Sequence, residues 1–113
     1  MIIYHIARKE DLQKVFAGEK YQGDTLQTEG FIHCSTAAQV VEVANQRFKG
    51  QVGLVLLCIE TDLVRPEIRY ENLEGGKKLF PHIYGPVNRD AIAKLVDFPL
   101  GEDGLFAFPE EIS

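Results

Sequence analysis

The sequence predicts an α+β fold built from short strands and short helices. Strand-like and helix-like segments are mixed along the chain, without the regular strand–helix–strand repetition of a doubly wound sheet. Hydrophobic residues make up 45% and charged residues 26% of the 113 residues, which is typical of a globular domain. This length suits a single domain, residues 1–113, because it leaves no room for two independent cores.

Extended segments are predicted where β-branched, aromatic and apolar residues gather. Residues 1–7 carry no breaker and predict a strand in the interior of a sheet. Residues 52–59 form a nearly continuous apolar run, which predicts a central strand covered on both faces. Further strands are predicted at residues 31–35, 68–71, 79–84 and 91–98.

Two helices are predicted from apolar residues at helical spacing. The first covers residues 9–17, and the second follows a capping box formed by Thr36 and Gln39 and runs to about Phe48. Residues 19–29 are mostly polar, so we expect an irregular connection there, of a length that is often functional.

Charge and hydropathy narrow the class of protein. The chain has 17 acidic and 12 basic residues, a formal net charge of −5, and its basic residues are scattered, which disfavours nucleic acid as a partner. The longest apolar run is far shorter than the roughly 20 residues that span a bilayer, and the first residues do not resemble a secretory signal. We therefore predict a cytoplasmic protein without a membrane segment. Cys34 and Cys58 form no CxxC pair and are expected to be buried, unpaired side chains.

The histidines carry the strongest functional signal. All 3 of them, His5, His33 and His82, lie in extended and otherwise apolar segments. Strand alternation groups Phe31 with His33, and His82 with Tyr84. Burying a polar group without a hydrogen-bond partner costs about 1–3 kcal/mol, so we expect these imidazoles to share partners or to line a common cleft.

Other polar residues lie near these strands. Glu71 ends a predicted strand on the same face as Arg69, where a carboxylate can bind ribose hydroxyls or stabilise a cation. Thr36 is a helix-cap candidate, and amides at that helix start are also suited to an anionic group. The predicted catalytic residues are His5, His33, Glu71 and His82, and the predicted ligand-binding residues are His5, Ser35, Thr36 and Tyr84.

A zinc site is the main chemical alternative. Three histidines and a water complete a tetrahedral zinc site, which leaves a zinc-dependent hydrolase open. The sequence contains no HxH or HExxH element, so no metal is expected. Phosphate-loop, GxGxxG and GxSxG motifs do not occur either, and they are the signatures of P-loop nucleotide-binding enzymes, Rossmann dehydrogenases and α/β hydrolases.

Four segments together resemble a known family. They are YHIA (residues 4–7), EGFIHCSTAAQ (29–39), RYE (69–71) and FPHIYGP (80–86). In this order and spacing they are similar to the bacterial family catalogued as domain of unknown function 952, and the similarity covers nearly the whole chain.

The resemblance implies a fold akin to the ADP-ribosyltransferases, in which NAD binds in a cleft between two small, mostly antiparallel sheets with two to three short helices. It implies that His5 is similar to a first-strand histidine that hydrogen-bonds an NAD ribose. Ser35 and Thr36 are similar to a strand-end Ser-Thr pair. Glu71 stands in for the late-strand glutamate of that fold, and His33 and His82, which the common triad lacks, are similar to the histidines of RNA 2′-phosphotransferases.

The expected function follows from both arguments. The chain is expected to bind NAD or another ADP-ribose-containing nucleotide as a small-molecule partner, and to act as an enzyme of the ADP-ribosyl-transfer type. A noncatalytic module that binds a metabolite or a peptide fits the same residues and stays open beside it.

Overall fold

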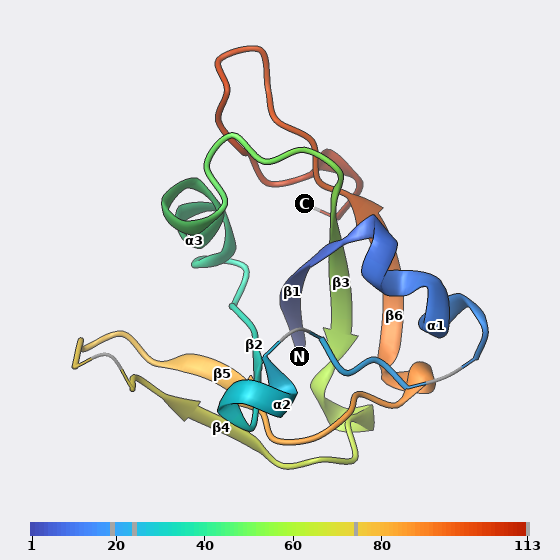
Figure 1. The fold of residues 1–113 in the computed structure, drawn as a ribbon. Coiled ribbons are helices and arrows are strands. Elements are labelled where there is room, and N and C mark those ends of the chain that lie inside the picture. The colour runs from blue at the N-terminus through green and yellow to red at the C-terminus, as the bar shows by residue number, and fades with distance from the viewer. Residues whose placement is uncertain (19, 24, 74, 113) are drawn as a thin grey trace.

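The computed structural model describes residues 1–18, 20–23, 25–73 and 75–112. Within these residues the strands form two antiparallel sheets of three strands each (Figure 1). The first sheet has the order β1 (Ile2–Arg8), β3 (Leu54–Glu60), β6 (Ile92–Asp97). The second has the order β2 (Ile32–His33), β5 (Phe80–Ile83), β4 (Ile68–Glu71). The α+β fold with two small antiparallel sheets is therefore confirmed.

The helices are short and lie outside the sheets. They are α1 (Gln13–Phe16), which follows a 3₁₀ turn at Lys9–Leu12, α2 (Leu26–Glu29) and α3 (Val40–Arg47). Further 3₁₀ turns cover Thr61–Leu63, Arg89–Ala91 and Glu110–Ile112. No helix in the described part of the chain is long and apolar enough to cross a membrane.

Two predictions about the helices need correction. The connection at residues 19–29 is not irregular throughout, because its last residues form α2; residues 19 and 24 lie outside the described part. The second helix begins only at Val40. The side chain of Gln39 accepts a hydrogen bond from the backbone N–H of Thr36 at 3.1 Å, as in a capping box, but the chain first makes a turn whose amides bond the Thr36 carbonyl. The first residue before α3 is therefore Gln39 rather than Thr36, and no side-chain hydrogen bond caps this helix.

The predicted central strand is confirmed as β3, which lies between β1 and β6. Its residues from Leu54 to Ile59 are all buried, because apolar clusters cover both of its faces. One cluster lies between the two sheets and includes Ile3, Leu57, Ile59, Ile32 and Ile83. The other lies beneath α3 and the C-terminal segment and includes Leu56, Val40, Ala44, Phe98 and Phe106.

β1 was expected in the interior of a sheet, and this is wrong, because the strand order places it at an edge. β1 pairs with β3 along its length, and on its other side Tyr4 exchanges two backbone hydrogen bonds of 2.8 Å with Ser35, just beyond β2. Among the backbone pairings of the described residues, this bridge links the first sheet to the segment that follows β2. Both Cys34 and Cys58 are buried and unpaired, as predicted.

Candidate active site

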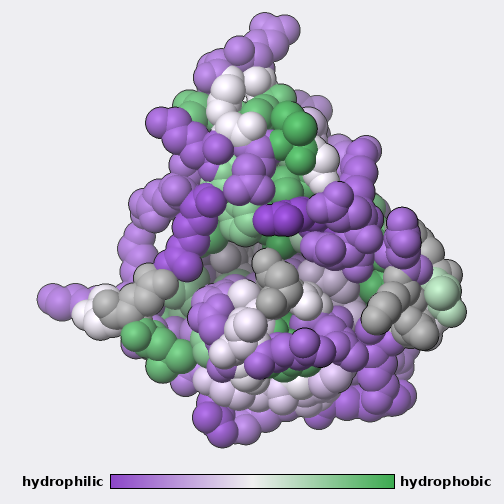
Figure 2. Space-filling model, in the orientation of Figure 1, coloured by the Kyte–Doolittle hydropathy of each residue, from purple (hydrophilic) through white to green (hydrophobic). Residues whose placement is uncertain are grey.

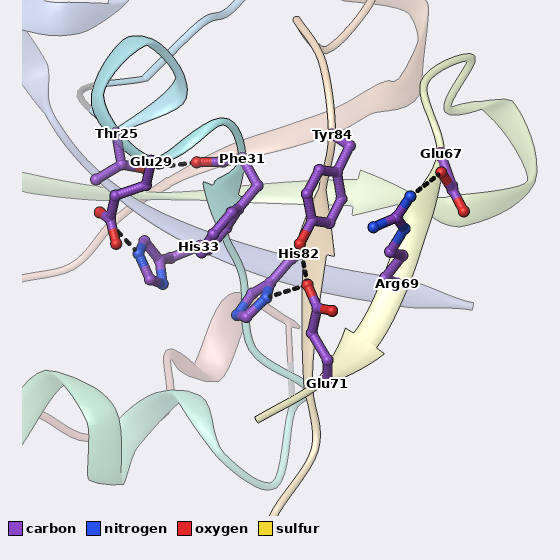
Figure 3. Close-up of polar contacts among 9 residues, drawn as sticks. All are labelled: Thr25, Glu29, Phe31, His33, Glu67, Arg69, Glu71, His82 and Tyr84. Atoms are coloured by element: carbon purple, nitrogen blue, oxygen red, sulfur yellow. Dashed lines mark hydrogen bonds and ion pairs between the residues drawn. The ribbon is translucent and has the colours of Figure 1, made fainter. Parts of the chain in front are cut away.

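The second sheet has one apolar face and one face rich in polar and aromatic side chains. Ile32 and Ile83 belong to the core between the sheets, so their neighbours along the strands project to the opposite side. We call this opposite surface the histidine face; its members are Phe31, His33, Arg69, Glu71, His82 and Tyr84. Figure 3 shows them side by side over β2, β5 and β4.

Strand register brings these residues together. His82 lies directly opposite His33 on one neighbouring strand and directly opposite Arg69 on the other. Glu71 pairs with Phe80 and is therefore the diagonal neighbour of His82, within reach of a long side chain. The strand register thus places His33, His82 and Arg69 in one row across the sheet.

Glu71 is the hydrogen-bonded centre of the face. Its Oε1 accepts a hydrogen bond from His82 Nδ1 at 3.0 Å and another from the Tyr84 hydroxyl (Figure 3). These two bonds hold the pKa of the Glu71 carboxyl below its usual value, and the bond from Tyr84 has the larger effect. The bond between Tyr84 and Glu71 also raises the pKa of the Tyr84 phenol. Glu71 therefore stays ionised at neutral pH, and the side chain of His82 is only 6% exposed beside it.

A second carboxylate holds the other histidine. Glu29 Oε2 lies 3.2 Å from His33 Nε2, at the end of α2. Gly30 has a φ of 86°, a conformation that ends the helix and turns the chain back, so that Glu29 lies beside a residue on the following strand. The Thr25 hydroxyl fixes this turn by donating to the Phe31 carbonyl at 2.7 Å. Each histidine of the histidine face is thus paired with a carboxylate, His82 with Glu71 and His33 with Glu29.

Phe31 fixes the positions of both imidazoles. Its ring stacks on His82 with centroids 4.2 Å apart and meets His33 edge-on at 4.8 Å. The two imidazoles themselves lie 5.3 Å apart, at an interplanar angle of 76°. Phe31 is only 5% exposed, so it acts as a buried wedge between the histidines and Tyr84.

Arg69 supplies the positive charge of the face. Its guanidinium lies 4.4 Å from the centroid of the Tyr84 ring and donates to Glu67 at 3.0 Å. That carboxylate raises the pKa of Arg69. The Arg69 side chain is about half exposed, so a cation lies beside the Glu71 carboxylate at the solvent boundary.

His5 lies elsewhere. Its Nδ1 is 2.5 Å from the backbone carbonyl of His33, and its Nε2 is 2.7 Å from the Tyr21 hydroxyl. The ring contacts Tyr21 and is 5% exposed, on the side of β1 that faces the core between the sheets. The structure therefore brings two of the three imidazoles together and places the third on the inner side of β2.

Ser35 and Thr36 lie just past the end of β2. Ser35 is buried and pairs through its backbone with Tyr4, and the backbone of Thr36 bonds the Gln39 side chain. Among the hydrogen bonds of the described residues, neither side chain contacts the histidine face. Tyr84 and Glu71, by contrast, lie on it as described above.

Two hollows of the described structure lie outside this face. One, of about 380 Å³, lies beside Tyr21, and a smaller one, of about 210 Å³, lies beside Leu12 and Leu95. Neither of these two is lined by a histidine. Among the described residues, no group of three His, Cys, Asp or Glu side chains is arranged to hold a metal ion.

Strand alternation grouped Phe31 with His33 and Arg69 with Glu71 in the sequence, but neither Phe31 nor Arg69 was named as a site residue. Two further contributors, Glu29 and Tyr21, were not predicted at all. Glu29 reaches His33 only through the turn at Gly30, and Tyr21 meets His5 only through the tertiary fold. No local pattern indicates these last two contacts.

The fold and the site define a small α+β protein whose second sheet presents a surface of carboxylate-bound histidines. Residues 6–95 match the family described as "Protein of unknown function (DUF952)", and the chain belongs to this family. No curated protein matches the chain.

Solved structures of one related protein share the fold. The crystal structure of protein CC0527 from Caulobacter crescentus is 30% identical in sequence, with a TM-score of 0.82 over 95% of this chain and 94% of the other. The solution structure of the same protein is 31% identical, with a TM-score of 0.77 over 92% and 90%. The arrangement of the two sheets is thus a property that the two proteins share.

Proposed function

We propose that the chain binds NAD or another ADP-ribose-containing nucleotide on the histidine face and transfers or hydrolyses its ADP-ribosyl group. The observation that carries this proposal is the Glu71 carboxylate, which two hydrogen bonds hold ionised beside a pair of imidazoles. The resemblance to ADP-ribosyltransferases and the pair of small antiparallel sheets support the same assignment.

The charges on this face suit the parts of such a nucleotide. Arg69 is a half-exposed cation that is able to meet a diphosphate, because its planar guanidinium has donors to spare beyond Glu67. Glu71 and the exposed side of His33 suit ribose hydroxyls, which both donate and accept hydrogen bonds. The residues present therefore fit a ligand that carries both negative phosphates and neutral hydroxyls.

The proposed chemistry uses Glu71 and His33 in different ways. Cleavage breaks the bond from the ribose C1 to the nicotinamide nitrogen, and the electron pair goes to that nitrogen, so nicotinamide leaves uncharged and needs no acid. Positive charge develops on the ribose and is stabilised by the Glu71 carboxylate. An acceptor hydroxyl or water forms the new bond to C1 and gives its proton to His33, whose other nitrogen faces Glu29.

A titration followed by a turnover assay tests the proposal. We expect calorimetric heat with both NAD and ADP-ribose, and release of nicotinamide detectable by chromatography. Glu71→Gln should lower the release rate by about 10²–10³-fold, because a neutral amide stabilises a cation poorly, and should leave ADP-ribose binding largely intact. Glu102→Gln, a change at an exposed position in the C-terminal segment, is the matched control and should change neither.

Two results would overturn the assignment. Absence of heat with NAD and with ADP-ribose at about 1 mM would remove nucleotide binding altogether. Equal nicotinamide release by the wild type and Glu71→Gln would remove the proposed role of the carboxylate.

A noncatalytic binding module is the second candidate, and one observation favours it. Phe31 already stacks on one face of His82, and the Arg69 guanidinium lies over the Tyr84 ring, so these groups are engaged within the protein rather than left free for a reaction. In this case His33→Ala would lose ligand affinity while the wild type releases no nicotinamide. Binding with no turnover would therefore decide for this module.

A further inference from the structure

We infer that His5 is a positioning residue: its imidazole replaces a missing backbone hydrogen bond between β1 and β2 and thereby sets the position of His33. The effect of His5 on ligand binding rests on the proposed function, whereas the contact between His5 and the His33 carbonyl does not depend on any ligand. Its starting point is the bridge at which Tyr4 and Ser35 exchange two hydrogen bonds of 2.8 Å.

An antiparallel ladder that continued from this bridge would have a defined next step. Hydrogen-bonded pairs recur every second residue, so Ile6 would lie opposite His33 and its N–H would donate to the His33 carbonyl. In the structure this carbonyl instead meets His5 Nδ1 at 2.5 Å. The side chain of the intervening residue has taken the place of the backbone donor, at the point where the two sheets separate.

The position of His33 depends on this bond because β2 is so short. The strand contains only Ile32 and His33, and it lies at the edge of its sheet, paired on one side with β5. On its other side, the His5 imidazole is the donor that holds the His33 carbonyl. The N–H of the same peptide, that of Cys34, donates to the Pro81 carbonyl at 3.0 Å, so His5 fixes the carbonyl end of a peptide that β5 holds at the other end. Loss of the His5 bond would let this peptide tilt and move the His33 ring relative to His82, 5.3 Å away.

The bond also fixes the protonation of one nitrogen. A backbone carbonyl only accepts, so His5 Nδ1 must carry a proton, whereas Nε2 faces the Tyr21 hydroxyl at 2.7 Å. Tyr21 in turn exchanges backbone hydrogen bonds of 2.9 and 2.8 Å with Val87. His5 is therefore held from both ends, and its role is exerted through the backbone of His33 from the interior.

Asparagine and glutamine distinguish this role from simple core packing. The side-chain nitrogen of asparagine lies at the same number of bonds from the backbone as His Nδ1, so His5→Asn retains the donor to the carbonyl. Glutamine places its nitrogen one bond further out, near the position of Nε2. A core residue that acted by bulk alone would tolerate glutamine better than asparagine.

The experiment compares the wild type with His5→Ala, His5→Asn and His5→Gln, with two readouts. In the wild type, long-range ¹H–¹⁵N spectra should show a proton on His5 Nδ1. In His5→Ala, the imidazole resonances of His33 should shift and ADP-ribose affinity should fall by about tenfold or more, as expected when a binding group is misplaced. His5→Asn should restore both readouts toward the wild type, and His5→Gln should not.

The outcomes separate this inference from the proposed function. An unprotonated His5 Nδ1 in the wild type would overturn the inference without any variant, which covers the case in which His5→Ala does not fold. A folded His5→Asn whose His33 resonances differ as much as those of His5→Gln would also overturn it. If ADP-ribose does not bind the wild type, the proposed function fails, and the His33 resonances still decide the role of His5.

Discussion

His33 and His82 lie directly opposite each other in the antiparallel pairing of β2 with β5, with their ring centroids 5.3 Å apart. On the other face of the same strands, Ile32 lies opposite Ile83, and both are fully buried. A shift of the register by one residue would exchange the two faces of a strand. Burial of these isoleucines in the core therefore fixes the register that places both imidazoles on the opposite face.

We expect Ile83→Ala to be strongly destabilising. Ile83 is completely buried between the sheets and lies opposite both Ile32 and Ile68, so its truncation leaves a cavity that costs about 2–5 kcal/mol of unfolding free energy. Chemical denaturation measures this loss. The control is Leu79→Ala, next to the start of β5, where the side chain is 55% exposed and the change should stay within about 0.5 kcal/mol. Equal effects of the two variants would contradict the register argument.

Acid should weaken the fold through Glu71. The folded-state pKa of this carboxyl is lowered, so its stabilising contribution is present above the unfolded value of about 4.3 and is lost as the pH falls through the folded pKa. Unfolding free energies measured between neutral pH and about pH 3 should therefore decline in the wild type. Glu71→Gln should decline less over the same range. A pH dependence identical in the two proteins would show that Glu71 is not held ionised by its neighbours.

Tyr84→Phe should raise the pKa of the Glu71 carboxyl. The phenol hydroxyl makes the largest contribution to the lowered pKa of this carboxyl, ahead of His82, so its removal should raise the Glu71 pKa toward the ordinary value. Titration of the ¹³C carboxyl resonance of Glu71 measures the change directly. Tyr70→Phe on β4 is the matched control, because the Tyr70 hydroxyl contacts the Met1 sulfur rather than Glu71. An unchanged Glu71 titration in Tyr84→Phe would rule out the hydrogen bond.

Gly30→Ala should destabilise the turn that places Glu29 beside His33. A Cβ on Gly30 meets no other atom, but the φ of 86° is unfavourable for a residue with a side chain, by about 1–2 kcal/mol. Gly30→Asn should cost less, because asparagine adopts this conformation more readily. Thermal unfolding compares the two variants. Equal losses would indicate that the backbone conformation at this position is not the cause.

Neither cysteine should react in the folded protein. Burial raises the pKa of the Cys34 thiol far above its ordinary value, and burial also raises the pKa of Cys58, so little thiolate forms at neutral pH. A colorimetric thiol reagent should therefore label neither residue until denaturant is added, after which both should react. Rapid labelling without denaturant would contradict the burial of these side chains.

Much of the fold was predictable because its signals are local. The apolar run of β3 is dictated by burial on both faces, and period-two alternation correctly grouped His82 with Tyr84, and Phe31 with His33. The free, buried state of both cysteines likewise follows from their apolar surroundings.

The features that were not predicted from the sequence depend on contacts between distant segments. Alternation shows which side of a strand a histidine occupies, but it does not show that the face of β1 bearing His5 looks toward the inner side of β2, so His5 was grouped with the other imidazoles. The position of β1 at an edge depends on strand order, which no propensity encodes. The start of α3 at Val40 reflects a turn after Thr36 that competes with the capping box.

The side of the molecule seen in Figure 2 is mostly hydrophilic, with hydrophobic patches of limited size. Against this background, the histidine face is distinguished by its mixture of charges and rings rather than by apolarity.

The hairpin of β4 and β5 supplies most of the histidine face. The hairpin and the residue that follows it contribute four side chains to the face, those of Arg69, Glu71, His82 and Tyr84. The sheet of β1, β3 and β6 contacts the backbone of β2 through His5, on the side opposite the histidine face. The same hairpin also supplies Ile68 and Ile83 to the core between the sheets. A substitution in this one segment is therefore able to change the histidine face and the stability of the fold together.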